Sequence, residues 1–367
     1  MTTLPSQTYR VFEKIKATCE REKLIVPHSL VVLGVSGGID SMLLLAFLAR
    51  YRTFVPFRLI ACHVNHMIRG RAADLDESLV ESLCKDHEIT FVCLWEDVPL
   101  YAKQHNIGIE QAGRIIRRER LQKIGRDYGD KMGIESGVRV ALAHHMDDRA
   151  ESILMHMGRG AGLRGLIGIQ YLDGPFIRPL LDIRRAELVA AAEAMDLRWR
   201  EDESNRSDDF LRNRIRNRLL PAWEETVGYD LAPSLVRLGT LAADDDAALT
   251  MIAKESYGRV VLSDHSLSLP TLLSLPKAIA SRVLQQFFRQ RMMENRRDKI
   301  DCMQYNLSAR NINDLLELST AVWAGDTRHA RLSLPGGMEA CLLDGRMEML
   351  SYAGRDGHDN YEKRRKK

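Results

Sequence analysis

Residues 30–41 read LVVLGVSGGIDS, an apolar run that leads directly into a glycine-rich turn. The run at residues 30–35 is typical of a strand buried on both faces, and the apolar stretch at residues 42–48 predicts a helix after the turn. A strand, a glycine turn and a helix in this order bring backbone N–H groups and the positive end of a helix dipole to one point. This stretch therefore predicts a phosphate-binding turn.

The chain up to residue 222 repeats this alternation. Further strands are predicted over residues 58–66, 90–94, 138–143 and 176–180, and further helices over residues 7–21, 73–88, 110–125 and 147–157. Such alternation is typical of βαβ units and predicts an α/β fold, with a Rossmann-like parallel sheet covered by helices on both faces. Ligands bind such sheets at the carboxyl ends of the strands.

The character of the sequence changes near residue 222. Residues 223–355 predict a mostly helical C-terminal domain that ends in a small β-hairpin, with strands over residues 330–334 and 340–350 and Pro335-Gly336-Gly337 at its turn. Residues 356–367 form a basic tail that we expect to be disordered. The sequence therefore predicts domains at 1–222 and 223–355, followed by the tail.

Composition restricts the class of protein. Of the 367 residues 45% are hydrophobic, which is enough for a globular core. No stretch of 18 apolar residues predicts a membrane span and no signal-peptide core opens the chain, so we expect no membrane partner and a cytoplasmic location. None of the six cysteines lies in a CxxC pair, which argues against a zinc site or a disulfide framework.

Charge is unevenly distributed along a chain whose net charge is only +3. Arginines and lysines gather at residues 108–126, at residues 206–218 and in the tail. Such patches suit a polyanion such as RNA, although each could equally be an ordinary solvated helix face.

The turn at residues 36–41 carries the most specific chemistry. Ser36 and Ser41 offer hydroxyl donors, and Gly37 and Gly38 let backbone amides approach a phosphate. Asp40 would repel a bare polyphosphate, but it suits a Mg²⁺ ion that bridges phosphate oxygens. The alternative is a plain Gly-Gly turn with a capping residue. The turn is neither a Walker loop nor a GxGxxG motif.

The hexapeptide SGGIDS resembles the pyrophosphate loop of the PP-loop, or N-type ATP pyrophosphatase, superfamily, whose fold is adenine nucleotide alpha hydrolase-like. The resemblance implies that domain 1–222 is a catalytic domain that cleaves ATP between its α- and β-phosphates and adenylates an oxygen, with Mg²⁺ as cofactor. It implies ATP contacts from Ser36, Gly37, Gly38, Ile39, Asp40 and Ser41, with Asp40 as catalytic residue and metal ligand.

Further segments resemble the tRNA(Ile)-lysidine synthase family. They read HVNHMIRG (63–70), EQAGR (110–114), HHMDDRAE (144–151), GRGAGLRGL (158–166), IRPLL (177–181), EDESN (201–205) and FLRNRIR (210–216). The sequence has Arg118 where the family has an aromatic residue, Arg149 in place of Gln and Ser152 in place of Thr.

The second resemblance implies residue roles. His63, Asn65 and Arg114 would bind ATP; His144, Asp148 and Glu151 would be catalytic; and Arg117, Arg159, Arg164, Arg212, Arg214 and Arg216 would contact tRNA. We nominate Asp148 as the proton acceptor, with His144 as second choice, and Glu151 as the group that holds lysine. The alternative for Asp148 and Glu151 is a structural cap of the helix that follows.

The resemblance implies ATP-dependent attachment of L-lysine to carbon 2 of the wobble cytidine in tRNA(Ile) with a CAU anticodon, through an adenylated tRNA. We expect that tRNA as partner and leave a homodimer open. Two alternatives stay open: a PP-loop tRNA thiolase, which usually needs cysteine pairs or an iron–sulfur cluster, and a non-catalytic RNA-binding protein on the same fold.

Overall fold

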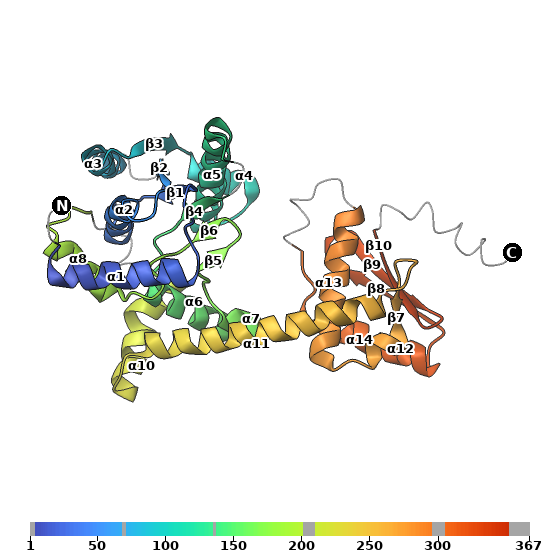
Figure 1. Ribbon diagram of the computed structural model, residues 1–367. Helices are drawn as coiled ribbons and strands as arrows, with labels where there is room; N and C mark the ends of the chain where they lie inside the picture. The colour runs from blue at the N-terminus through green and yellow to red at the C-terminus, as the bar shows by residue number, and fades with distance from the viewer. Residues whose placement is uncertain (1–3, 68–70, 135–136, 201–209, 296–304, 352–367) are drawn as a thin grey trace. The chain divides into compact units, whose positions relative to one another are not determined.

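The computed structural model describes residues 4–67, 71–134, 137–200, 210–295 and 305–351 (Figure 1). The chain forms two compact units, Met1–Ala242 and Ala243–Lys367. The division falls inside helix α11 (Leu231–Val260), while the domain bounds predicted from the sequence stay predictions. The basic tail at residues 356–367 and the EDESN segment at residues 201–205 lie outside the described residues.

A six-stranded sheet in the order β3-β2-β1-β4-β6-β5 forms the centre of the first unit. Its strands are β1 (Leu30–Gly34), β2 (Arg58–Asn65), β3 (Thr90–Trp95), β4 (Val138–Ala141), β5 (Leu172–Asp173) and β6 (Phe176–Ile177). All neighbouring pairs are parallel except β5–β6. Because β2 and β4 lie on opposite sides of β1, the order of strands reverses there, and such a switch point is where open α/β sheets bind ligands.

Helices cover both faces of this sheet, as the sequence predicts (Figure 1). One face packs against α1 (Ser6–Arg21), α2 (Ile39–Tyr51), α3 (Arg71–Asp86) and α8 (Arg185–Ala194). The other packs against α5 (Ile109–Met132), which in turn carries α4 (Val98–His105). The sequence reasoning missed α4 and α8. A local signal for α4 exists, because the Asp97 side chain accepts the Leu100 N–H at its start.

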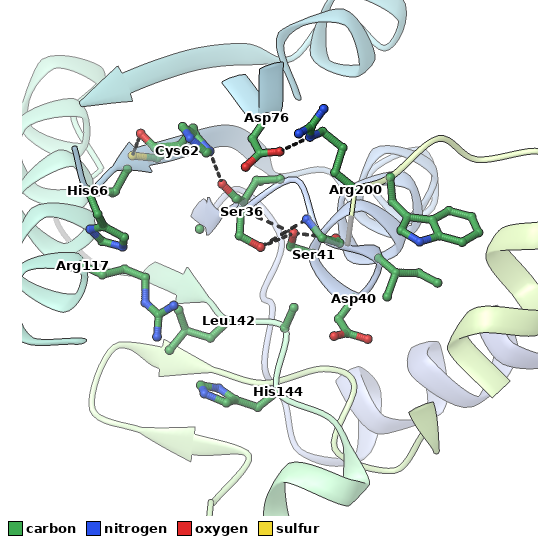
Figure 2. Close-up of a pocket in the computed structure, with 18 of the residues that line it drawn as sticks. Ser36, Asp40, Ser41, Cys62, His66, Asp76, Arg117, Leu142, His144 and Arg200 are labelled. Atoms are coloured by element: carbon green, nitrogen blue, oxygen red, sulfur yellow. Dashed lines mark hydrogen bonds and ion pairs between the residues drawn. The ribbon is translucent and has the colours of Figure 1, made fainter. Parts of the chain in front are cut away.

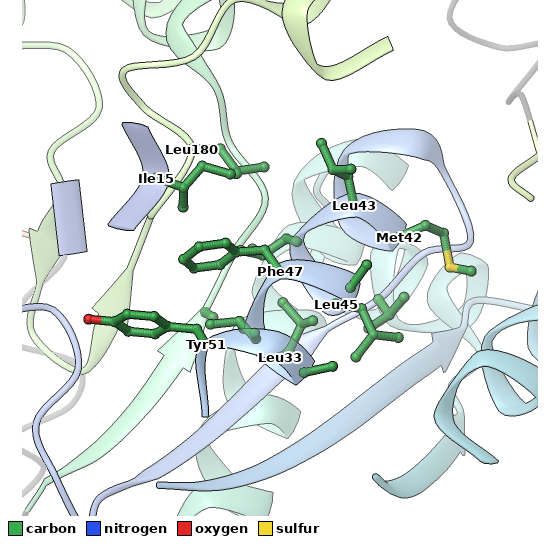
Figure 3. Packing of buried hydrophobic residues seen from close by; sticks show 14 of the residues in the cluster. Ile15, Leu33, Met42, Leu43, Leu45, Phe47, Tyr51 and Leu180 are labelled. Atoms are coloured by element: carbon green, nitrogen blue, oxygen red, sulfur yellow. The ribbon is translucent and has the colours of Figure 1, made fainter. Parts of the chain in front are cut away.

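The larger core lies between the sheet and the face that carries α2. Helix α2 is buried almost all round, because α1 and α8 cover the side that the sheet leaves open. The Phe47 ring contacts the rings of Phe12 and Tyr51 at centroid distances of 5.3 and 5.2 Å, and Figure 3 shows Phe47 and Tyr51 with Ile15 in this core. A helix fixed so firmly holds the turn before it in place.

Short helices and the first part of α11 complete this unit. They are α6 (Met146–Gly158), α7 (Leu163–Leu166), α9 (Leu211–Arg214), the π-helix η2 (Ile215–Leu219) and α10 (Leu220–Val227). Ile153 of α6, Ile215 of η2 and Leu231 of α11 meet in one buried cluster. A π-helical turn is rare and frequently marks a functional site.

The second unit combines helices with a four-stranded antiparallel sheet in the order β7-β10-β9-β8. Its elements are α12 (Leu269–Leu273), α13 (Lys277–Asn295), α14 (Ala309–Ala324), β7 (Leu267–Ser268), β8 (His329–Leu334), the 3₁₀ turn η4 (Pro335–Gly337), β9 (Met338–Leu343) and β10 (Arg346–Ser351). The predicted hairpin is present as β8 and β9, but the predicted second strand over residues 340–350 is two strands. The chain reverses at Asp344 and Gly345, both with positive φ.

No helix among the described residues is long and apolar enough to cross a membrane.

Candidate active site

A cavity of about 880 Å³ opens at the carboxyl ends of β1, β2 and β4 (Figure 2). It lies at the switch point of the sheet, and its volume falls in the range typical of small-molecule sites. It brings together ten of the predicted site residues: Ser36, Gly38, Ile39, Asp40, Ser41, His63, Asn65, Arg117, His144 and Arg216. The predicted residues that do not line it, apart from Gly37 within the turn, are Arg114, Asp148, Glu151, Arg159, Arg164, Arg212 and Arg214.

The turn at residues 36–41 forms one wall of the cavity and is held by its own hydroxyl groups. Ser41 Oγ accepts the Ser36 N–H at 3.1 Å and donates to the Gly38 carbonyl at 2.9 Å. Gly37 has φ +84°, a conformation that costs little only for glycine. Because α2 begins at Ile39 with no side chain capping it, its first N–H groups and dipole point into the cavity. The turn can therefore bind an anion.

Asp40 stands in the first turn of α2 and lacks a hydrogen bond. Its Oδ1 is buried without a partner, and its Oδ2 lies 3.9 Å from His145 Nε2. Burial raises the pKa of Asp40, and the charge of Asp148 adds to that rise. Among the described residues, no group of three His, Cys, Asp or Glu side chains could hold a metal ion. A carboxylate with one oxygen that has no partner among the described residues nevertheless fits Mg²⁺ next to a phosphate turn, because Mg²⁺ is commonly held by one or two carboxylates and substrate phosphates.

His63 and Asn65 follow each other along the same end of β2, where the sequence predicts a nucleotide contact. His63 Nδ1 lies 2.9 Å from the Val35 carbonyl oxygen, and the Asn65 amide oxygen accepts the Met67 N–H at 3.0 Å. Both side chains are buried and line the cavity. These contacts fix the side chains as a preformed wall.

The two arginines predicted on α5 have different surroundings. Arg114 is exposed and lies outside the cavity, whereas Arg117 lines it. Burial lowers the pKa of Arg117, and the nearby charges of Arg114 and Arg212 lower it further. Its Nε is buried without a hydrogen-bond partner, so Arg117 presents a positive charge that suits an anionic ligand.

Two adjacent histidines at the end of β4 have pKa values shifted in opposite directions. Burial lowers the pKa of His144 to about 3, although Asp148 opposes this, so His144 is neutral at pH 7. Its Nδ1 is buried without a hydrogen-bond partner. Burial also acts to lower the pKa of His145, but the carboxylates of Asp148, Asp147 and Asp40 outweigh it and the pKa is raised.

Asp148 and Glu151 lie on one face of α6, as their spacing predicts, and both are paired. Arg212 donates to Glu151 Oε2 and to Asp148 Oδ1, each at 2.7 Å. Arg216 donates to Glu151 Oε1 at 2.5 Å and to Asp148 Oδ1 at 3.1 Å. Glu151 is fully buried. We call these four residues the carboxylate–arginine cluster.

The cluster affects the pKa of Asp148 and holds the start of α6 in place. Burial acts to raise the pKa of Asp148, but His145 and Arg212 outweigh it and the pKa is lowered. Asp148 Oδ2 also accepts the His145 N–H at 2.9 Å, so Asp148 caps α6 as well. The predicted RNA contacts of Arg212 and Arg216 stay predictions, and the structure directs both guanidinium groups inward.

Asp147 connects the site to two helices without lining the cavity. Its Oδ2 accepts the N–H of Arg185, the first residue of α8, at 2.8 Å and lies 3.4 Å from His145 Nδ1. Its Oδ1 lies 2.5 Å from Arg184, whose Nε is 3.0 Å from Asp230 at the start of α11. One carboxylate thus fixes both His145 and the backbone of Arg185.

The glycine-rich segment at residues 158–166 follows α6. Arg159 and Arg164 are exposed there and the cavity does not include them. A Cβ added at Gly158, Gly160 or Gly162 would meet nothing within 4 Å, so these glycines are not required by packing. Arg214 is likewise exposed on α9, and the RNA-contacting role of these three arginines stays a prediction.

The cavity also has lining residues outside the predicted site, among them Asp76, Arg185, Trp199 and Arg200. Asp76 lies six residues after HVNHMIRG, and Trp199-Arg200 immediately precedes EDESN, so proximity to a motif was the available signal. Arg185 had no such signal, because α8 itself was not predicted. Arg118 and Arg149, the departures noted above, lie outside the cavity, and Arg118 packs on the Phe176 ring with 3.7 Å from its guanidinium carbon to the ring centroid.

Comparisons with known proteins agree with this geometry. A family model described as a PP-loop domain matches residues 7–223, more than half of the chain. The tRNA(Ile)-lysidine synthase of Chlorobaculum tepidum is 37% identical over 232 residues, which cover 63% of this chain and 68% of the relative. That of Caldanaerobacter subterraneus subsp. tengcongensis is 35% identical over 258 residues, which cover 70% of this chain and 54% of the relative.

The chain spans about half to two thirds of the length of these curated relatives. Among solved structures, the U34-tRNA thiolase NcsA from Methanococcus maripaludis aligns with a TM-score of 0.51 at 22% identity, covering 65% of this chain and 79% of that one. This likeness shows the fold alone. On its sequence relatives and its matched domain, the chain belongs to the PP-loop family and to the tRNA(Ile)-lysidine synthase family within it.

Proposed function

We propose that this protein uses ATP to join L-lysine to carbon 2 of the wobble cytidine in tRNA(Ile) with a CAU anticodon, giving lysidine, AMP and pyrophosphate. The observation that carries the proposal is the turn at residues 36–41, which opens its amides into a cavity of about 880 Å³ beside Asp40, whose Oδ1 has no hydrogen-bond partner among the described residues. Membership of the family supports the choice of substrates.

The first step is attack of the cytidine carbonyl oxygen on the α-phosphorus of ATP, with pyrophosphate leaving. The turn and the N-terminus of α2 would bind the phosphates through backbone N–H groups. Asp40 would hold Mg²⁺, which when bound neutralises charge on the leaving pyrophosphate. Arg117 would stabilise the negative charge that develops near the cavity wall opposite the turn.

In the second step the lysine ε-amine attacks carbon 2, the carbon–oxygen bond breaks, and AMP leaves with the oxygen. The amine attacks in its neutral form and then loses a proton, so a proton acceptor must be near. His144 is neutral at pH 7, lines the cavity and has an Nδ1 without a partner among the described residues, so it can accept a proton, but a pKa lowered to about 3 makes it a weak base in the free protein. Asp148, our first choice from the sequence, is ionised but already accepts three hydrogen bonds within 3.1 Å.

Glu151 remains our proposed site for the lysine ammonium group. Since Arg212 and Arg216 already contact its carboxylate, lysine would bind there only after one guanidinium group moves away. Lysine and the two arginines would therefore compete for the same oxygens.

Purified protein with ATP, labelled lysine and a tRNA(Ile) transcript tests the proposal. We expect label in the RNA and equal amounts of AMP and pyrophosphate. Without lysine, AMP should not be released and pyrophosphate should not exceed the amount of tRNA, because only the first step can occur. A methionine tRNA transcript in place of the substrate should give no label, AMP or pyrophosphate. Nucleotide release without label in RNA would contradict it, and sulfur incorporation from a supplied donor would instead favour a thiolase. A cytoplasmic location and a homodimer stay predictions, and light scattering checks the second.

A further inference from the structure

The segment before residue 201 lies against the phosphate turn. The Arg200 N–H donates to the Gly37 carbonyl at 3.1 Å, and the Arg200 carbonyl oxygen is 4.0 Å from the position a Cβ would take at Gly38. Figure 2 shows the Arg200 side chain on the side of the cavity that carries Ser36 and Ser41. The backbone at residue 200 is therefore fixed to the turn itself.

Asp76 approaches the same turn from α3. Its Cβ lies 3.2 Å from the position a Cβ would take at Gly37, and its Oδ1 lies 2.6 Å from Arg200 Nε. The Asp76 side chain is 13% exposed and that of Arg200 is 40% exposed. Both line the cavity. A pair that contacts the turn from two separate elements differs from an isolated surface ion pair, whose contribution is small.

Asp76 places a negative charge beside the phosphate-binding turn. A carboxylate next to a phosphate-binding turn repels the phosphates unless a cation neutralises it. Arg200 Nε lies 2.6 Å from Asp76 Oδ1 and offsets its charge. The two terminal nitrogens of Arg200 have no acceptor among the residues that the structure describes. They can donate hydrogen bonds to a ligand in the cavity, and a guanidinium group suits phosphate because it can donate two parallel bonds.

We propose that Arg200 binds the β- and γ-phosphates of the nucleotide and the pyrophosphate that is released, and that Asp76 is the positioning residue that orients it. The inference rests on the proposed use of ATP. It assigns to Arg200 an ATP contact of the kind that the family resemblance implies for Arg114. Arg114 is exposed and lies outside the cavity.

Binding measured by calorimetry with Mg²⁺, and without RNA or lysine, tests the inference. Arg200→Ala should lower the affinity for ATP and for pyrophosphate at least tenfold. It should change the affinity for AMP less than twofold, because AMP lacks the distal phosphates. Arg200→Lys should fall between, since it keeps the charge but loses the paired donors. Arg198→Ala is the matched control: Arg198 is exposed two residues earlier and outside the cavity, and its replacement should change nothing.

A double variant separates a phosphate contact from a structural role. Arg200→Ala removes the Arg200 contact that offsets the charge of Asp76 beside the phosphates, so adding Asp76→Asn should restore ATP affinity about threefold or more. A purely structural ion pair would give no such recovery. In turnover, Asp76→Asn alone should raise KM for ATP several-fold while kcat changes less than twofold.

Equal weakening of ATP and AMP by Arg200→Ala, or no weakening by either Arg200→Ala or Arg200→Lys, would overturn the inference. Thermal melts establish whether each variant is folded. If Arg200→Ala does not fold, the ATP and AMP affinities of Arg200→Lys test the inference instead. If the wild-type protein binds ATP as described but makes no lysidine, the proposed function fails and the role of Arg200 stands. If it does not bind ATP, both fail.

Discussion

Replacing Glu151 with glutamine removes one negative charge from the carboxylate–arginine cluster while keeping the size of the side chain. The Glu151 side chain is 1% exposed, and its oxygens accept from Arg212 at 2.7 Å and from Arg216 at 2.5 and 3.1 Å. In Glu151→Gln, two guanidinium groups would share the single charge of Asp148. Breaking a buried pair from one side costs roughly 3–5 kcal/mol.

The lower end of that range applies, because the Arg212 and Arg216 side chains are 30% and 24% exposed and water can solvate them in part. A loss of about 3 kcal/mol in a unit of this size corresponds to a fall in Tm of roughly 6–12 °C. Urea unfolding followed by circular dichroism at pH 7 gives the free energy directly. Glu225→Gln is the control, since Glu225 is exposed on α10, and it should change Tm by less than about 1 °C.

A fall in Tm below about 2 °C for Glu151→Gln would refute this reasoning, because the carboxylate would then not support the two arginines. Arg216→Leu in the Glu151→Gln background completes a double-mutant cycle, and we expect the two changes together to cost less than the sum of the single costs.

Three further predictions concern the cavity. Because the pKa of His144 is lowered to about 3, the unfolded chain binds a proton between pH 6.5 and 3 that the folded chain does not. The free energy of unfolding should therefore fall as pH is lowered from 7 to 5, by about 2 kcal/mol more in the wild-type protein than in His144→Asn. Equal slopes of unfolding free energy against pH in the two proteins would contradict this prediction. Gly37→Ala places a Cβ at φ +84° and 3.2 Å from Asp76; calorimetry should show ATP affinity reduced at least tenfold, whereas Gly158→Ala, in open space, should leave it unchanged. Asp40→Asn should abolish the gain in ATP affinity on adding Mg²⁺ without lowering Tm, because Asp40 Oδ1 has no hydrogen-bond partner among the described residues and Oδ2 has only a 3.9 Å contact with His145 there; a Mg²⁺ effect of wild-type size would rule out Asp40 as the ligand.

Much of the first unit could be predicted from local pattern. Strands β1 to β4 are continuous apolar runs, and the residues that follow them meet because parallel strands end at one edge of a sheet. That is why His63, His144 and the phosphate turn line one cavity. The geometry follows from the strand order β3-β2-β1-β4.

The partners of the acidic residues could not be predicted in this way. The i, i+3 spacing of Asp148 and Glu151 shows only that they share a helix face. Their pairing with Arg212 and Arg216 joins residues 61–68 positions apart, and such contacts depend on how separate elements pack. The same holds for Arg200 and Asp76, which are far apart in the sequence.

The prediction of one strand over residues 340–350 was wrong, and a local sequence pattern indicates two strands instead. Residues 340–350 alternate in a way that suggested a single strand, yet Asp344-Gly345 is a typical two-residue hairpin turn, with both residues at positive φ. Attention to that dipeptide would have predicted β9 and β10 separately.

The contacts of Asp147 imply that the start of α11 affects chemistry it never touches. A substitution at Asp230 would remove one of the two carboxylates that hold Arg184 and leave it on Asp147 alone. Because the other oxygen of Asp147 contacts both His145 and the first N–H of α8, a shift of Asp147 would alter how His145 faces Asp40. Sequence changes at the first turn of that long helix are therefore expected to appear as altered metal and nucleotide affinity, even when the protein remains fully folded.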